Sequence, residues 1–143
     1  MDKYCADILI VDDTLENLQL LASILKEVGY KVRPASSGKQ AIAAIEHRQP
    51  DLILLDIKMP EMDGYEVCRL LKSRPETKAI PIIFISALTD LEDKLKAFQV
   101  GGLDYISKPF QFEEVKARVW THLQLKSYQD EMEVKVAEGV QNV

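Results

Sequence analysis

Five side chains that can do chemistry together stand at the ends of short apolar segments in this sequence. They are, in chain order, Asp12, Asp13, Asp56, Ser86 and Lys108. The run of residues 52–55, for example, is wholly apolar and leads directly into Asp56. Burying an unpaired charge is costly, so carboxylates in such positions normally have partners. The first question is therefore whether these side chains meet.

Three carboxylates at one place repel one another unless a cation lies among them, and their oxygens suit Mg²⁺, with Mn²⁺ as a possible substitute. A divalent ion, an ammonium and a hydroxyl facing a carboxylate would hold a phosphoryl group and offset its charge. Asp56 would then be the nucleophile that forms an acyl phosphate. The competing interpretation is that these acids only favour helix starts, which explains one position better than five.

The order of segments predicts how the five side chains are positioned. Strand-like segments at residues 7–13, 31–36, 51–57, 80–87 and 104–108 alternate with helical segments at 14–30, 38–49, 63–73, 90–101 and from about 112. Near-continuous apolar strands indicate a parallel sheet covered on both faces, and hence a doubly wound α/β fold. In such folds ligands bind at the carboxyl ends of the strands. Thr14 and Gly29 are the expected start and stop of the first helix.

The segment from residue 115 onwards is longer than a last helix needs to be. Leu125, Tyr128, Met132 and Val136 recur at spacings of three and four residues. Two interpretations remain equally open, a short coiled-coil seam and a frayed amphipathic terminal helix.

Composition limits the function classes. The 143 residues suit one domain, and no run is long enough to span a bilayer. No secretory signal core is recognisable, so we expect a cytoplasmic protein with no membrane partner. The net charge of −5 argues against direct nucleic-acid binding. We expect Cys5 and Cys68 to be reduced, packed thiols.

The chain resembles the receiver domains of two-component response regulators. The likeness rests on the pair Asp12-Asp13, on "LLDIKMPEMDG" around Asp56, on "ISA" with Ser86 and on "DYISKPF" with Lys108. These motifs occur in order between residue 7 and about residue 122. The resemblance implies a flavodoxin-like five-stranded sheet in the strand order 2-1-3-4-5, with an extended C-terminal helix. It divides the chain into a receiver domain at 1–122 and a helical extension or linker at 123–143.

The resemblance also implies roles for the residues. Asp56 would accept a phosphoryl group from a phosphohistidine on a sensor histidine kinase or phosphotransfer protein. Mg²⁺ would be held by Asp13, Asp56 and the backbone carbonyl of Lys58, with Asp12 acting largely through water.

Three further roles follow from the same likeness. Ser86 and Lys108 would each bind a phosphoryl oxygen, and Tyr105 would be the switch aromatic that turns inward when Ser86 moves. The Lys108-Pro109 peptide bond is expected to be cis.

The resemblance places the partner surface on the face made by the fourth helix, fifth strand and fifth helix. A homodimer would form through this face or through the C-terminal helix. We expect an output domain in the same full-length chain, and a cyclic-di-GMP enzyme or a histidine kinase resembles this pattern more than a winged-helix DNA-binding domain does.

Leu88, two residues after Ser86, gives no polar group to orient an attacking water, which predicts slow self-dephosphorylation. The chain would then be a regulatory phosphoacceptor rather than a turnover enzyme. His47 and His122 are expected to lie away from the site.

Rival classes fit less well. An aspartate-nucleophile Mg²⁺-dependent phosphatase of the haloacid-dehalogenase type usually carries a second Asp two residues after the nucleophile, where this chain has Lys58. A nucleotide- or flavin-binding domain would carry a glycine-rich loop after the first strand, where this chain reads "VDDTLEN". A scaffold that has lost the chemistry would not need the full set of reactive side chains.

Overall fold

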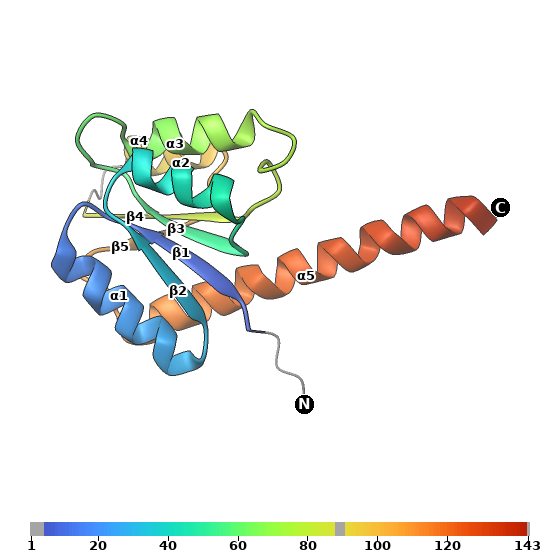
Figure 1. Ribbon diagram of the computed structural model, residues 1–143, viewed down its shortest axis with the longest axis horizontal. Helices are drawn as coiled ribbons and strands as arrows, with labels where there is room; N and C mark the ends of the chain where they lie inside the picture. Colours follow the sequence, from blue (N-terminus) through green and yellow to red (C-terminus); the bar gives the residue numbers. More distant parts are fainter. Residues whose placement is uncertain (1–4, 88–90, 143) are drawn as a thin grey trace.

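The computed structural model describes residues 5–87 and 91–142, with side chains up to Met132. The described residues form five strands and five helices that alternate along the chain (Figure 1). In order, they are β1 (Asp7–Val11), α1 (Leu15–Val28), β2 (Lys31–Ala35), α2 (Gly38–His47), β3 (Leu52–Asp56), α3 (Gly64–Lys72), β4 (Ile82–Ser86), α4 (Leu91–Gln99), β5 (Asp104–Ser107) and α5 (Phe112–Asn142).

The strands form one parallel sheet in the order β2-β1-β3-β4-β5, which confirms the predicted topology. Every residue of β1, β3 and β4 is buried, because helices cover both faces of these inner strands. Successive side chains of a strand point to opposite faces. Thus Ile8 and Ile10 pack with α1 and α5, whereas Leu9 and Val11 pack with α2, α3 and α4. Figure 1 shows the two helical layers on either side of the sheet.

The ends of α1 carry both predicted signals, but only one works as expected. Gly29 follows the helix with a φ of 112°, a left-handed conformation that glycine adopts without a steric penalty, and its N–H bonds to the carbonyls of Leu25 and Lys26. Thr14 occupies the N-cap position, yet its side chain makes no capping bond. Its backbone N–H instead donates to the Asp12 carboxylate, 2.9 Å away.

The last helix, α5, runs unbroken from Phe112 to Asn142 and extends well past the sheet (Figure 1). The predicted boundary between residues 122 and 123 therefore falls inside a continuous helix and stays a prediction. Leu125, Tyr128 and Met132 are about half exposed or more, whereas the side chain of Val136 lies outside the described part. The choice between a coiled-coil seam and an isolated helix stays open.

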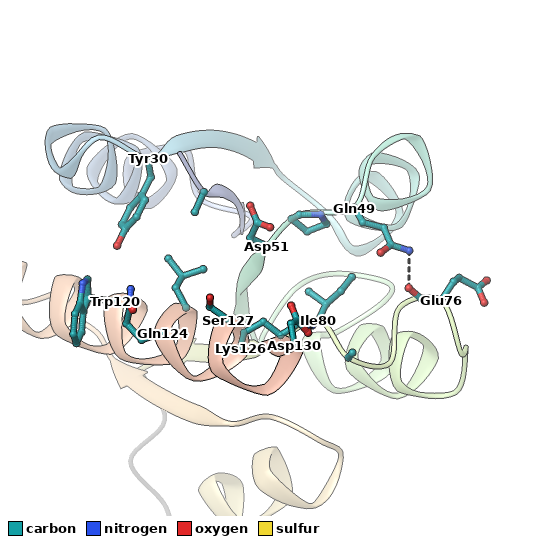
Figure 2. A pocket seen from close by; sticks show the side chains of 14 residues that line it. Tyr30, Gln49, Asp51, Glu76, Ile80, Trp120, Gln124, Lys126, Ser127 and Asp130 are labelled. Atoms are coloured by element: carbon teal, nitrogen blue, oxygen red, sulfur yellow. Dashed lines mark hydrogen bonds and ion pairs between the residues drawn. The ribbon is translucent and has the colours of Figure 1, made fainter. Parts of the chain in front are cut away.

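A cleft of about 780 Å³ lies between α5 and the amino ends of the strands. Its walls include residues just before β1, β2, β3 and β4, among them Ala6, Tyr30, Asp51 and Ile80. Figure 2 shows Trp120 and other α5 side chains across the cleft from Tyr30. This cleft is at the opposite end of the sheet from the carboxyl ends of the strands, where the predicted reactive residues lie.

No helix in the described ranges combines the length and the apolar character needed to cross a bilayer.

Candidate functional site

The topology brings the predicted reactive residues to one rim of the sheet. Asp56 and Ser86 are the last residues of β3 and β4, Asp12 directly follows β1, and Lys108 directly follows β5. In the sheet register Asp56 pairs with Ile85, one residue before Ser86, so these two strand ends are adjacent. Carboxyl ends of parallel strands all point the same way, and this is why residues far apart in the sequence share one rim.

Lys108 joins two of the carboxylates. Its ammonium nitrogen Nζ lies 3.1 Å from Asp12 Oδ2 and 3.3 Å from Asp56 Oδ1. The side chains of Asp12 and Asp56 are almost wholly buried, so these ion pairs are poorly screened by water. Partial burial lowers the pKa of Lys108, but the two carboxylates outweigh burial and raise it above the usual lysine value. The Lys108 side chain therefore stays protonated and positively charged at the rim. Its peptide bond to Pro109 is cis, as predicted.

Within the described part of the chain, only one group of three His, Cys, Asp or Glu side chains could hold a metal ion together. It consists of Asp12, Asp13 and Asp56. One carboxylate oxygen from each lies within 4.8 Å of the others, and Asp13 is exposed while the other two are buried. One ammonium does not balance three carboxylates, so the cluster keeps an excess of negative charge. An oxygen-only donor set with one solvent-facing member fits a hard divalent cation such as Mg²⁺, which keeps part of its water shell.

The pKa of Asp56 is far above the ordinary value of 3.8. Burial raises its pKa most, the neighbouring Asp12 charge raises it further, and Lys108 offsets only part of this, so that the pKa reaches about 7. Such a carboxylate favours binding a positive or electrophilic group, because that group offsets the cost of burying the negative charge and the repulsion from Asp12.

The rim opens to solvent through a depression of about 510 Å³ whose lining includes Asp13, Lys58, Met59 and Tyr65. The Lys58 side chain is exposed, so the loop after β3 leaves the mouth of the site accessible. Gly64 closes this loop against the end of β3. A Cβ atom on Gly64 would collide with the Asp56 carbonyl oxygen, so the requirement for glycine is steric.

Ser86 and Tyr105 are both buried. Burial is the main cause that raises the pKa of Tyr105, and the nearby Ser86 hydroxyl lowers this pKa, which offsets part of the effect of burial. The ring of Tyr105 lies inside the molecule, with the ammonium of Lys94 on α4 5.2 Å from its centre. The pair thus connects the rim to the face made by α4 and β5. Leu88, which the sequence linked to the lifetime of the acyl phosphate, lies outside the described residues.

Sequence reasoning missed two groups that bind Asp12. The side-chain amide of Asn17 and the backbone N–H of Thr14 both donate to its carboxylate. A usable signal existed, because side chains in the first turn of a helix lean back toward its N-terminus, where Asp12 lies.

Neither histidine takes part in the rim. His47 ends α2, and His122 on α5 places Nε2 2.9 Å from Asp104 on β5. The interaction of His122 is thus an internal one.

Comparison with known proteins agrees with this geometry. The profile of the response regulator receiver domain matches residues 8–120. A probable cyclic di-GMP phosphodiesterase of Vibrio cholerae is 42% identical over 86% of this chain, and the response regulator PleD of Caulobacter vibrioides is 39% identical over 94%. The chain spans only 28% and 30% of these two relatives.

Solved structures show the same fold. A putative response regulator from Chloroflexus aurantiacus superposes with a TM-score of 0.82 at 36% identity, covering 85% of this chain and 99% of its own. The chemotaxis protein CheY4 of Vibrio cholerae gives 0.77 at 28% identity, covering 84% and 99%. These matches do not support the phosphatase alternative. With its parallel five-stranded sheet, its acidic rim and a profile match over most of its length, the chain belongs to the response regulator receiver domain family.

Proposed function

We propose that this chain is a phosphoacceptor that receives a phosphoryl group on Asp56 and passes the signal to an output domain or partner. The observation that carries the proposal is Lys108 Nζ, placed 3.3 Å from Asp56 Oδ1 beside a cluster of three carboxylates. Membership of the receiver family supports the same conclusion.

The proposed donor is a phosphohistidine of a sensor histidine kinase or phosphotransfer protein. An ionised Asp56 oxygen attacks the phosphorus atom and forms a new P–O bond, while the P–N bond breaks and its electron pair stays on the imidazole nitrogen. That nitrogen is then protonated from water. The product is an aspartyl phosphate on this chain and a free histidine on the donor.

The residues at the rim would each serve this transfer. Asp13, Asp56 and the Lys58 carbonyl would hold Mg²⁺, with Asp12 acting through water, and Mn²⁺ would serve in its place. When bound, the cation supplies charge that offsets the charge of the phosphoryl oxygens.

Lys108 would pair with one phosphoryl oxygen, and the Ser86 hydroxyl would donate to another. Since the Ser86 hydroxyl lies near Tyr105, its movement would change the surroundings of the Tyr105 ring and of α4. The switch is proposed to shift the population of two states of the α4–β5–α5 face.

The same face is the proposed partner surface. Leu91, Leu95 and Phe98 on α4 and Leu103 just before β5 are all about half exposed or more. So many exposed large apolar side chains close together in the chain indicate a surface that binds a partner. We also propose that a homodimer forms through this face or through the extension of α5. The site of action is proposed to be the cytoplasm, and the 143-residue chain itself is proposed to bind neither nucleic acid nor a membrane directly.

The output domain is proposed to lie in the same full-length chain, joined through α5. The Vibrio cholerae relative named a probable cyclic di-GMP phosphodiesterase supports an enzyme of that class. Relatives named transcriptional regulators, at 37–40% identity over 78% of this chain, keep a DNA-binding output as the second candidate.

The test is phosphorylation by acetyl phosphate and Mg²⁺, read by intact-protein mass spectrometry. The parent should gain one phosphate that is lost in base, and Asp56→Asn should gain none, because an amide is a poor nucleophile.

A matched control is Asp63→Asn, which removes another carboxylate of the same loop. Asp63 caps α3 through its side chain, and asparagine caps equally well, so this variant should be labelled like the parent. Normal labelling of Asp56→Asn would show that another residue accepts the phosphate, and it would overturn the proposal.

A further inference from the structure

The side-chain amide of Asn17, in the first turn of α1, binds both oxygens of the Asp12 carboxylate. Its Nδ2 atom lies 3.3 Å from Oδ1 and 3.2 Å from Oδ2. The same carboxylate accepts the Thr14 N–H on Oδ1 and pairs with Lys108 Nζ, 3.1 Å from Oδ2. Each oxygen of this fully buried carboxylate thus has two donors, and Asn17 is the one that serves both.

The proposed function requires Lys108 to change partners. In this structure Lys108 binds Asp12 and Asp56, but after phosphoryl transfer it would pair with a phosphoryl oxygen. Its departure leaves Asp12 Oδ2 buried without its cationic partner. A buried acceptor that loses its partner destabilises the state in which this happens. A donor that remains in place lowers that penalty.

We propose that Asn17 is a positioning residue that keeps Asp12 hydrogen-bonded when Lys108 moves to the phosphoryl group. The inference rests on the proposed function and adds a residue to that site. A neutral amide suits the task, because it donates to the carboxylate without adding a second cation that would compete with the metal or with Lys108. Contact with both oxygens also fixes the plane of the carboxylate.

The variant Asn17→Leu keeps the branched shape and the number of heavy atoms of the side chain and removes the donor. Without the amide, Asp12 depends more on Lys108, so Lys108 is held back from the phosphoryl group. We expect beryllofluoride, a phosphoryl mimic, to bind about tenfold more weakly at saturating Mg²⁺, the size of one lost hydrogen bond to a charged group. Mg²⁺ alone should bind no more weakly than in the parent, because Asp12 then has one competing donor fewer.

The experiment measures two affinities on the same samples. Calorimetric titration gives the Mg²⁺ affinity, and NMR titration of backbone amides gives the beryllofluoride affinity. The quantity of interest is their ratio, since a general disturbance of the fold weakens both. Gln19→Leu, which removes an exposed amide from the same helix, is the matched control and should leave both affinities unchanged. Asn17→Ala is the second variant if Asn17→Leu unfolds below room temperature.

Three results would overturn the inference. Equal weakening of Mg²⁺ and beryllofluoride binding would make Asn17 a general support of the rim. Unchanged beryllofluoride affinity in both Asn17 variants would leave the amide without the assigned role. A parent protein that binds Mg²⁺ but not beryllofluoride would refute the proposed function itself, and this inference with it. The first two results leave the proposed function intact, so the two failures are distinguishable.

Discussion

The guanidinium of Arg118 binds the carboxylate of Asp104 through two hydrogen bonds, with Nη1 2.8 Å from Oδ1 and 3.0 Å from Oδ2. His122, one turn further along α5, adds a third contact at 2.9 Å. These contacts attach the first part of α5 to the start of β5, the strand that carries Tyr105. A change in β5 therefore has a direct polar route into the long helix.

The first prediction concerns the charge on Asp104. Burial by itself raises the pKa of Asp104, but hydrogen bonds from His122, the Tyr105 N–H and Arg118 outweigh it, so the pKa lies below the usual value. A lowered pKa means that the charged form stabilises the fold above about pH 4, and that this stabilisation is lost as the pH falls through the folded-state pKa. Asp104→Asn should lower the free energy of unfolding by about 1–2 kcal/mol at pH 7, near the low end for charged hydrogen bonds because Arg118 is partly exposed.

Urea unfolding at pH 7, 5 and 3 measures this effect, and the difference between parent and variant should be kept at pH 5 and shrink at pH 3. Asp130→Asn is the control, because the exposed Lys126–Asp130 pair on the same helix should contribute less than about 1 kcal/mol. An equal loss in both variants would argue against a special role for Asp104.

The second prediction has the opposite sign and concerns Asp56. Its folded-state pKa of about 7 lies above the ordinary value of 3.8, so the folded protein binds this proton more tightly than the unfolded chain does. The free energy of unfolding of the metal-free parent should therefore fall, relative to Asp56→Asn, as the pH rises from about 4 to 7. At pH 8 the variant should be more stable, by up to roughly 4 kcal/mol at 1.4 kcal/mol per pKa unit.

The measurement is urea unfolding with a chelator at several pH values, repeated with saturating Mg²⁺. The cation should stabilise the parent more than the variant and so narrow the difference. A parent that gains stability over Asp56→Asn between pH 5 and 8 without metal would contradict the raised pKa.

The third prediction concerns Gly64. A Cβ atom there would meet the Asp56 carbonyl and would lie 2.9 Å from Ile57 Cα, both backbone atoms that cannot move aside cheaply. Gly64→Ala should destabilise the protein by about 1–3 kcal/mol and weaken Mg²⁺ binding, since it displaces the end of β3. Gly29→Ala is the control: it strains a left-handed position at a cost of about 1 kcal/mol, but has no atom nearby to displace and should leave Mg²⁺ affinity unchanged.

The fourth prediction concerns the Ser86 hydroxyl and its influence on the buried Tyr105. Beryllofluoride with Mg²⁺ should shift the backbone amide signals of the rim and also those around Lys94 on α4. In Ser86→Ala the rim signals should still move at higher ligand concentration, whereas the shifts near Lys94 should become much smaller. Ser107→Ala alters the residue paired with Ser86 in the sheet and is the control. If the amide signals of α4 shift in Ser86→Ala as far as they do in the parent, the Ser86 hydroxyl is not needed for the switch.

Much of the site was predictable because strand ends are easy to recognise. Apolar runs that stop at Asp12, Asp56 and Ser86 specify buried parallel strands, and the common direction of those strands then places the side chains on one rim. The predicted stop at Gly29 was correct for a local reason, since the left-handed conformation depends on that residue alone.

Contacts between elements were not predictable in the same way. The bond from His122 to Asp104 depends on how α5 is rotated against the sheet, which no local pattern specifies. The pKa of Asp56 depends on burial and on a lysine 52 residues away. The length of α5 was only suggested by the lack of a turn signal.

Because α5 is unbroken, it would set the direction in which a domain fused to its end points relative to the receiver. A helix of 31 residues is about 46 Å long and turns by about 100° per residue. A domain fused beyond Asn142 would therefore have its direction set by the number of residues between it and the receiver. Seven inserted residues change that direction by only about 20°, whereas two inserted residues point it almost the opposite way. A domain joined through a continuous α5 would thus be related to the receiver by a rotation that the number of intervening residues sets.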